Sequence, residues 1–392
     1  MSDSSAGGRS IARAFPIEDV RRQFPALARA GRFVFFDNAA GAQIPAAVHD
    51  AVSDHLVARN VQRGGPYRQS REVDAGIARA RESVAAFVNA RGADEISFGL
   101  NATSFIRAIS LAIGQTLDAR PEIVVSDLDH ESNVATWLAL QRAGTMASNA
   151  TGTTVDVAEV ARRAHAVGAE VFLDAVHYAP HGPIDVQALD CDYLVCSGYK
   201  IFAPHMGFAW CRREAINRLP TFREDFIPDV TPDKLEAGTY AYENVAGMDA
   251  AIGYLEAIGR GADGAGLSRV DALGAAMSAI AEYERGLSRR LLDEAQSIAG
   301  VTVHGVASRD RLHERVPTLC FNVAGRDAAA VADALAARDI GVRSGHMYAP
   351  RLMARLGLAP HGAVRASLVH YNTAGEIERF AAALREAIAG TR

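Results

Sequence analysis

The chain has 392 residues, of which 49% are hydrophobic and 22% are charged, with a formal net charge of −5. This length is sufficient for two domains and a large core, and the slightly acidic balance argues against a surface that binds nucleic acid or acidic lipid. The four cysteines include no C-x-x-C pair, which argues against a zinc site or a disulfide framework.

The chain begins with a segment, 1–16, that lacks the apolar core of an export signal and is expected to form a flexible tail. No apolar run reaches the length of a membrane span. We therefore expect a cytoplasmic protein that contacts neither a membrane nor nucleic acid.

Strand-like and helical patterns alternate along the rest of the chain. Periodicity predicts a strand at 33–36, helices at 46–60 and 75–89, strands at 95–98, 122–126, 171–173 and 193–196, and helices over most of 244–299. A strand at 318–323, a helix at 328–338, a strand near 366–369 and a last helix from residue 373 follow. This alternation is typical of an α/β fold with a mostly parallel central sheet and a small α/β C-terminal domain.

Two of these predicted strands end in residues that carry chemistry. The strand at 171–173 leads to Asp174 and His177, and the next leads to Ser197 and Lys200. Because ligands of open α/β sheets bind at the carboxyl ends of strands, these side chains are expected at one edge. A desolvated lysine can form a Schiff base and a carboxylate can pair with a protonated pyridine nitrogen, which fits pyridoxal 5'-phosphate (PLP). Taken singly, Lys200 could be a surface lysine and Asp174 a helix N-cap.

Motifs spread from about Phe15 to the C-terminus together resemble the class V aminotransferase family of fold-type I PLP enzymes, most of all its cysteine desulfurase-like branch. They are FFDNAAGAQIP (35–45), NVQRGGPY (60–67), GLNATSFIRAIS (99–110), DHESNVATW (129–137), SNATGT (148–153), the 174–200 block, EAGTYAYENVAG (236–247), VRSGHMYAP (342–350) and VRASLVHYNT (364–373). The resemblance implies a large PLP-binding domain at 41–259 and a small domain formed by 17–40 and 260–392.

The resemblance also implies which residues would hold the cofactor. Ala102 and Thr103 open the helix after the strand at 95–98, and a helix N-terminus is suited to phosphate. His130 corresponds to the residue that stacks on the pyridine ring, and His177 stands where desulfurases usually carry Gln, near the phenolic oxygen. Ser197, Tyr199 and, from the partner in a homodimer, Thr239 are expected to contact the phosphate.

For the substrate, the resemblance implies a small amino acid. Arg365 corresponds to the arginine that grips its carboxylate, a task suited to a bidentate guanidinium. Asn149 is expected near that carboxylate and the cofactor oxygen, and Arg343 is a further substrate-binding candidate. Arg63, in RGGPY, is a candidate for the rim of the site. No metal site is expected.

One departure from the family pattern concerns the loop 343–348, which reads RSGHMY. Tyr348 stands where desulfurases carry the cysteine that accepts sulfur as a persulfide, and a tyrosine cannot supply the thiolate that this step needs. We therefore expect a transferase or lyase that acts at the α-carbon through Lys200, by transamination, elimination or racemisation. Elimination from a cysteine- or selenocysteine-like substrate stays open, as does a true cysteine desulfurase or selenocysteine lyase-type activity.

A second departure is the short connection between Trp137 and Ser148, where the family normally has an extra strand, a helix and another strand. The strand that aims Asn149 is reduced to about 145–147. The loss would expose sheet edges, so a non-catalytic or impaired protein that keeps the fold is the alternative to an enzyme.

Two other motif matches fail on their context. Residues 197–200 also fit the S-x-x-K of penicillin-binding proteins, but neither S-D-N nor K-T-G occurs in the chain. Residues 259–264 fit G-x-G-x-x-G but follow a helical stretch instead of a strand, which argues against a dinucleotide site.

Overall fold

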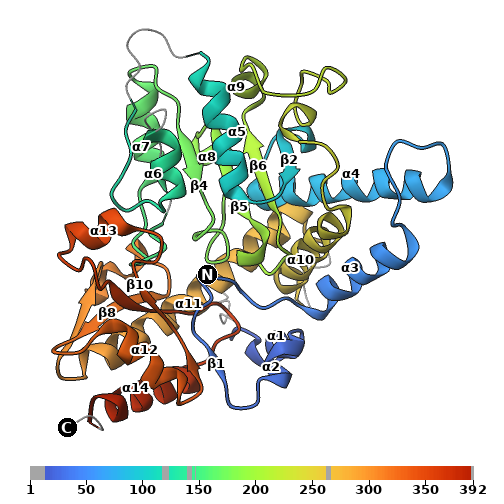
Figure 1. Ribbon diagram of the computed structural model, residues 1–392. Coiled ribbons are helices and arrows are strands. Elements are labelled where there is room, and N and C mark those ends of the chain that lie inside the picture. Colours follow the sequence, from blue (N-terminus) through green and yellow to red (C-terminus); the bar gives the residue numbers. More distant parts are fainter. Residues whose placement is uncertain (1–13, 117–122, 139–143, 146, 262–265, 390–392) are drawn as a thin grey trace, which may run out of the picture.

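The computed structural model describes residues 14–389 except 117–122, 139–143, 146 and 262–265 (Figure 1). Its larger part is built on a five-stranded sheet in the order β2-β6-β5-β4-β3. The strands are β2 (Ile96–Gly99), β3 (Gly144–Thr145), β4 (Phe172–Asp174), β5 (Tyr193–Ser197) and β6 (Gly207–Cys211). Only β6 runs against the others, because it pairs antiparallel with both β5 and β2. The predicted α/β fold with a mostly parallel sheet is confirmed.

The direction of β6 follows from the length of its connection. Nine residues, 198–206, join β5 to β6, whereas a parallel neighbour needs a crossover of about a dozen residues or more. A hairpin-like return closes instead, with Gly198 N–H donating to the Met206 carbonyl at 2.7 Å. Lys200 therefore lies in a short, constrained loop between two central strands. The sequence patterns did not predict β6.

The predicted strand at 122–126 is wrong where the structure describes it. Of residues 123–126, only Val125 makes an isolated bridge, and residue 122 lies outside the described residues. Phe15, placed by prediction in the flexible tail, stacks on Tyr283 with ring centroids 4.5 Å apart, so the tail prediction is wrong at this position. Residues 1–13 of that tail lie outside the described residues.

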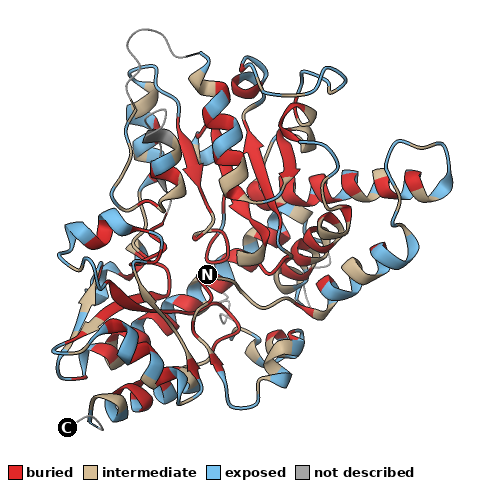
Figure 2. Cartoon of the chain, in the orientation of Figure 1, coloured by how far each residue is buried: buried red, intermediate tan, exposed pale blue. Residues whose placement is uncertain are grey.

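Both faces of the large sheet are covered, because its strands alternate between two apolar sets. Leu194 and Phe208 face one core, and Tyr193 and Ala209 face the other. Figure 2 shows these inner strands almost entirely buried. The first core includes residues of α3 (Ala46–Ala58), α4 (Arg68–Val88), α7 (Val157–His165), α10 (Tyr242–Arg260) and α11 (Arg269–Gln296), and the second those of α5 (Ala102–Gly114) and α9 (Arg213–Asn217).

The smaller part contains a four-stranded antiparallel sheet in the order β10-β11-β8-β7. Its elements are β7 (Val301–His304), β8 (Thr318–Val323), β10 (Arg343–Gly345), β11 (Ala363–Ser367), α12 (Ala328–Ala336), α13 (Pro350–Arg355) and α14 (Ala374–Ala389). The N-terminal segment joins it, since β1 (Val34–Phe35) pairs with β9 (Ile340–Gly341) and Asp37 bridges to Ser367. This pairing brings the FFDNAAG motif beside β11.

The remaining α-helices of the described residues are short: α1 (Ile17–Arg22), α2 (Pro25–Arg29), α6 (Ser132–Leu138) and α8 (Val186–Leu189). Among the helices of the described residues, none combines the length and the apolar character needed to cross a membrane.

Candidate active site

Lys200 ends a 3-10 turn, Gly198–Lys200, directly after β5. The turn needs glycine at its start, because a Cβ on Gly198 would lie 2.7 Å from the Pro204 carbonyl oxygen. The Lys200 ammonium donates to the Ala39 carbonyl. Burial and the nearby positive charge of Arg365 lower the pKa of Lys200 to about 7. A large fraction of this amine is therefore unprotonated near neutral pH, as a nucleophile requires.

Asp174 lies at the carboxyl end of β4 and is buried. Its carboxylate accepts hydrogen bonds from Asn133 Nδ2 at 2.6 Å and from Val176 N–H at 2.8 Å. The second bond is an Asx turn, and no helix begins there, so the N-cap alternative is wrong. No lysine or arginine among the described residues lies within ion-pair distance of Asp174. A buried carboxylate without a cationic partner fits the protonated ring nitrogen of PLP.

The N-terminus of α5 meets the ends of β5 and β6. Asn101 caps the helix in a capping box with Ser104, in which Asn101 Oδ1 accepts from Ser104 N–H at 2.9 Å. Ala102 N–H donates to Ser197 Oγ at 3.1 Å. β6 approaches closely because it begins with glycine: a Cβ on Gly207 would lie 2.6 Å from the Asn101 carbonyl carbon. The structure thus brings Ala102 and Ser197 together at a helix N-terminus, a position suited to phosphate, and Thr103 follows in the first turn of the helix.

Two histidines lie on other sides of this space. The pKa of His130 is lowered by burial, and its ring lies 5.4 Å from the ring of Tyr348. His177 is buried and pairs through Nε2 with Thr318 Oγ1 at 3.1 Å. Burial and neighbouring His181 lower the pKa of His177 well below its usual value, so this imidazole is neutral at pH 7. The nearby Tyr199 stacks on His205 with centroids 5.0 Å apart.

The end of the site where the substrate carboxylate is expected, around Arg365, contains a residue that the sequence patterns did not identify. Asp37 accepts from Arg365 at 2.8 Å and forms an ion pair with Arg343 at 2.7 Å. Arg365 is fully buried, and it also donates to the Asn149 backbone carbonyl at 2.9 Å. Two guanidinium groups and one carboxylate leave one net positive charge. Asp37 stands in the FFDNAAG motif, but only the β1–β9 pairing and the bridge to Ser367 bring it to the arginines.

Two buried polar atoms at this end have no hydrogen-bond partner among the described residues: Asn149 Oδ1 and Arg365 Nε. The Asn149 amide nitrogen donates to the Met347 carbonyl. Unpartnered buried polar atoms are rare in native proteins and mark places where a ligand or water completes the hydrogen bonding. The residues present therefore fit a bound cofactor and an amino-acid carboxylate.

The loop that carries Tyr348 has an unusual backbone. Met347 and Tyr348 both adopt left-handed φ values, 52° and 58°, and the Tyr348 carbonyl accepts from Glu131 N–H at 2.7 Å. Strained residues of this kind cluster at functional sites. No cysteine lies in the loop. The four cysteines of the chain are all buried, and burial raises the pKa of the Cys191 and Cys320 thiols to about 12, so none is poised as a thiolate.

Two predicted residues are not joined to the residues around Lys200. Thr239 is exposed and accepts from Gln62 Nε2 at 2.8 Å, and Arg63 pairs with Asp74 at 3.2 Å. The prediction that Thr239 reaches the phosphate of a partner subunit concerns a second chain and stays a prediction. Within the described residues, no cluster of His, Cys, Asp or Glu could hold a metal ion.

A comparison with known proteins matches the family model "Aminotransferase class-V" to residues 34–147 and 143–380. The chain is 32% identical to the aminotransferase-like protein FGM3 of Gibberella zeae (94% of this chain, 98% of the relative). It is 31% identical to a cysteine desulfurase of an Enterobacter species (95% and 98%).

Among solved structures, it resembles the apo cysteine desulfurase of Thermococcus onnurineus, with a TM-score of 0.85 and 25% identity (97% and 99% of the two chains). It also resembles the Escherichia coli cysteine desulfurase CsdA, with a TM-score of 0.80 and 25% identity (96% and 99%). The two alignments with the curated relatives span 413 and 424 positions, more than the 392 residues of this chain. The relatives therefore carry positions that this chain lacks, and the family match divides at 143–147, the connection predicted to be short.

Proposed function

Because the chain belongs to the aminotransferase class-V family, whose members depend on PLP, we propose that it acts at the α-carbon of a small amino acid through Lys200. The reaction is a transamination, an elimination or a racemisation. The observation that carries this proposal is the placement of two groups: Lys200 follows β5, and the buried carboxylate of Asp174 ends the neighbouring parallel strand β4. The lowered pKa of Lys200, about 7, agrees with a nucleophilic amine at this position.

Different residues of the site would contact different parts of the cofactor. Asp174 would pair with the ring nitrogen, His130 would lie against the ring, and neutral His177 would contact the phenolic oxygen. Bound PLP supplies an aldehyde that forms a Schiff base with an amine and a ring that draws electrons from the α-carbon. The phosphate would lie against Ala102, Thr103, Ser197 and Tyr199, with Thr239 of a second copy in a homodimer.

Lys200 is then the residue that moves protons. Its amine, neutral in a large fraction of molecules at pH 7, takes the proton from the α-carbon and returns it at the same or a neighbouring atom. From the opposite end, the unpartnered Nε of Arg365 would donate to the substrate carboxylate, and the unpartnered Oδ1 of Asn149 would accept from an N–H or O–H group of the substrate or cofactor.

The charge at that end supports a substrate with one carboxylate. Arg343 and Arg365 carry two positive charges, and Asp37 neutralises one of them. A single α-carboxylate completes the balance, whereas a second carboxylate would add a negative charge that this group of residues does not neutralise. We therefore assign neutral monocarboxylic amino acids as the substrate class.

A persulfide on the enzyme is not part of this proposal, since Tyr348 takes the cysteine place in the loop and all four cysteines are buried. The cysteine desulfurases among the relatives favour cysteine as one candidate substrate. Sulfur would then leave the substrate by elimination and not by attack of an enzyme thiolate.

The chain offers a clean test because its sequence contains two lysines, Lys200 and Lys234. Lys234 has a fully buried side chain, donates to the Leu219 carbonyl at 2.9 Å and pairs with Asp229 at 3.0 Å. After addition of PLP and reduction with borohydride, peptide mapping should find the pyridoxyl group on the Lys200 peptide and not on the Lys234 peptide. Lys200→Ala should abolish the visible absorbance of the bound cofactor.

The proposal fails if the purified protein takes up no added PLP or if the pyridoxyl group is found on Lys234. A protein that binds PLP on Lys200 but shows no spectral change with any single amino acid would support the non-catalytic alternative. Release of alanine from cysteine with a persulfide trapped on the protein would overturn the assignment of Tyr348.

A further inference from the structure

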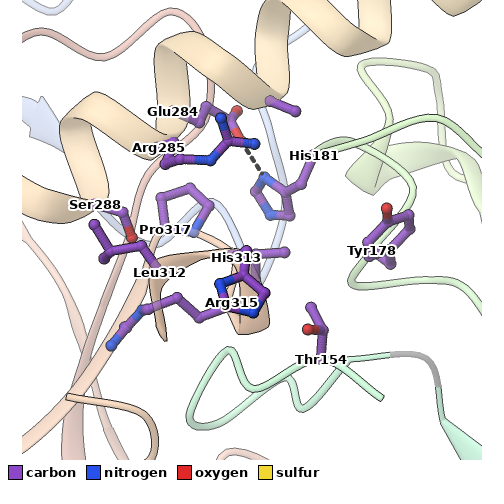
Figure 3. Close-up of a pocket in the computed structure, with 12 residues that line it drawn as sticks. Thr154, Tyr178, His181, Glu284, Arg285, Ser288, Leu312, His313, Arg315 and Pro317 are labelled. Carbon is purple, nitrogen blue, oxygen red and sulfur yellow. Dashed lines mark hydrogen bonds and ion pairs between the residues drawn. The ribbon is translucent and has the colours of Figure 1, made fainter. Parts of the chain in front are cut away.

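A buried pair of titratable residues, His181 and Glu284, lies next to His177 and has no part in the proposed function. His181 belongs to the segment after β4, four residues beyond His177, and its Nδ1 pairs with Oε2 of Glu284 in α11 at 2.7 Å. Both residues line a cavity of about 110 Å³, and Figure 3 shows Glu284 reaching from α11 toward the His181 ring. The two side chains are 3% and 2% exposed, so water does not screen the pair.

Glu284 depends on His181 for its charge balance. Among the described residues no lysine or arginine forms an ion pair with it, and the adjacent Arg285 pairs with Glu282 instead. The backbone N–H of His370 hydrogen bonds to the Glu284 carboxyl group, and burial raises the pKa of that group. Because a buried carboxylate is tolerated only when it is neutral or paired with a cation, Glu284 and His181 together hold one proton.

The His181 ring is packed against His177. The two ring centroids lie 5.5 Å apart at an interplanar angle of 78°, an edge-to-face contact, while His177 Nε2 pairs with Thr318 Oγ1 at 3.1 Å. Burial is the main cause that lowers the pKa of His177, and His181 is the next. The charges of Lys200 and Arg365 act in the same direction. Both the orientation and the charge of His177 therefore depend on its neighbour.

We propose that His181, held by Glu284, is a positioning residue for the site around Lys200, which fixes the His177 ring and keeps it uncharged. The contact of His177 with the phenolic oxygen of PLP is part of the proposed function, on which this role of His181 rests. An uncharged imidazole offers that oxygen a hydrogen bond without adding a second positive charge beside Lys200 and Arg365.

The pair also has an electrostatic effect on the Schiff base that PLP forms with Lys200. With the proton on the imidazole, the positive member of the pair is His181, which contacts His177, and the negative member is on α11. A nearby positive charge disfavours protonation of the Schiff-base nitrogen. For two opposite charges at unequal distances and an effective dielectric constant of about 20, the pH at which this nitrogen loses its proton falls by about half a unit.

The test follows the visible absorbance of the PLP-loaded protein as a function of pH. Glu284→Gln keeps the shape of the side chain and an oxygen that accepts from His181 Nδ1, so the fold should be retained, which the melting temperature checks. The midpoint pH of the absorbance change should rise by about half a unit or more, because the charged pair is lost. His181→Gln should raise it equally, and the double variant no further, since the two residues act as one pair.

His165 provides the matched control. It pairs with Asp192 at 3.0 Å, but Asp192 precedes β5 whereas Lys200 follows it, and five strand residues span about 16 Å. His165→Gln should therefore leave the midpoint unchanged. A ¹⁵N NMR spectrum of the wild-type apoprotein requires neither a variant nor the cofactor, and it should show His177 as an imidazole with one protonated nitrogen at pH 7.

An unchanged midpoint in folded, PLP-loaded Glu284→Gln and His181→Gln would overturn the proposal. So would additive shifts in the double variant, or an equal shift in His165→Gln. A doubly protonated His177 in the apoprotein would refute it without reference to the cofactor. If the protein takes up no PLP, the proposed function fails, while the NMR spectrum still decides the charge of His177, so the two failures can be told apart.

Discussion

Asp37→Asn is the substitution that examines the charge balance of the active site most directly. The Asp37 carboxylate bridges Arg365, whose side chain is 2% exposed, and Arg343, whose side chain is 39% exposed. Asparagine keeps the shape but removes the charge, so two guanidinium groups then face each other without an acid. The two ion pairs contribute differently to the unfolding free energy, because a buried pair is costly to break and an exposed pair contributes little.

Breaking a fully buried pair costs about 3–5 kcal/mol. Since the Asp37 side chain is itself 26% exposed, water offsets part of the loss and we expect about 2–3 kcal/mol of unfolding free energy. Asp94→Asn is the matched control: its pair with Arg213 has side-chain exposures of 45% and 47%, and its loss should cost less than about 1 kcal/mol. Thermal and urea unfolding of the two variants measure the difference.

The same substitution should change the substrate preference. With two uncompensated arginines, the site should favour a dicarboxylic over a monocarboxylic amino acid by about 10- to 100-fold more than wild type does, the value of one charge-assisted hydrogen bond. Spectral titration of the PLP-loaded variant with alanine and with aspartate gives the ratio. Asp37 also raises the pKa of Lys200, so its removal should lower that pKa further. An unchanged alanine-to-aspartate ratio in a folded variant would refute the charge balance.

Other predictions concern the cofactor end and the thiols. Asp174→Asn should weaken PLP binding about tenfold or more, because the ring nitrogen loses a charged partner; equal affinity in a fluorescence titration would contradict its role. Gly207→Ala should cost about 1–3 kcal/mol, since its Cβ would lie 2.6 Å from Asn101, whereas Gly253→Ala, with nothing within 4 Å, should not destabilise. PLP uptake by the apoprotein should accelerate with pH up to about 7 and then level off, because only the unprotonated Lys200 amine attacks; a rate still rising at pH 10 would exclude a lowered pKa. Iodoacetamide at pH 8 should label none of the four buried cysteines without denaturant; rapid labelling of the native protein would show an accessible thiol.

The residues that could be predicted from sequence are those whose position follows from a local pattern. Asp174 and Lys200 each follow an apolar run, and the carboxyl ends of neighbouring parallel strands share one edge. Ala102 follows a strand and opens a helix, which is also a local signal, while its phosphate role was implied by the family resemblance; the cap is Asn101. These parts of the site required no knowledge of distant contacts.

Asp37 could not be predicted in this way, because its role depends on contacts with Arg343 and Arg365, more than 300 positions away. The direction of β6 could not be predicted either. Residues 207–211 are all buried, so the run lacks the alternation of polar and apolar residues that would mark it as a strand. The run at 122–126 has a strand-like composition, but its described residues form no continuous pairing with another strand. Tertiary pairing decided each of these cases, in agreement with the context dependence of strand formation.

The short connection before Asn149 shows why the site can persist when part of the sheet is reduced. β3 is only two residues long, yet the following turn is held from another direction. Ser148 N–H donates to the Thr153 carbonyl at 2.8 Å, and the turn then pairs with the segment before β8, through Thr154 N–H to Glu314 and Val316 N–H to Gly152.

Asn149 itself is fixed by two contacts from the smaller part of the protein, Arg365 to its carbonyl and its amide to Met347. The strand that the family pattern would place before Asn149 is therefore not what holds this residue in the structure. Its position depends on the small sheet and the strained 347–348 backbone. A shortened central sheet is for this reason compatible with the proposed position of Asn149 beside Arg365, which favours the proposed enzyme over a protein that merely keeps the fold.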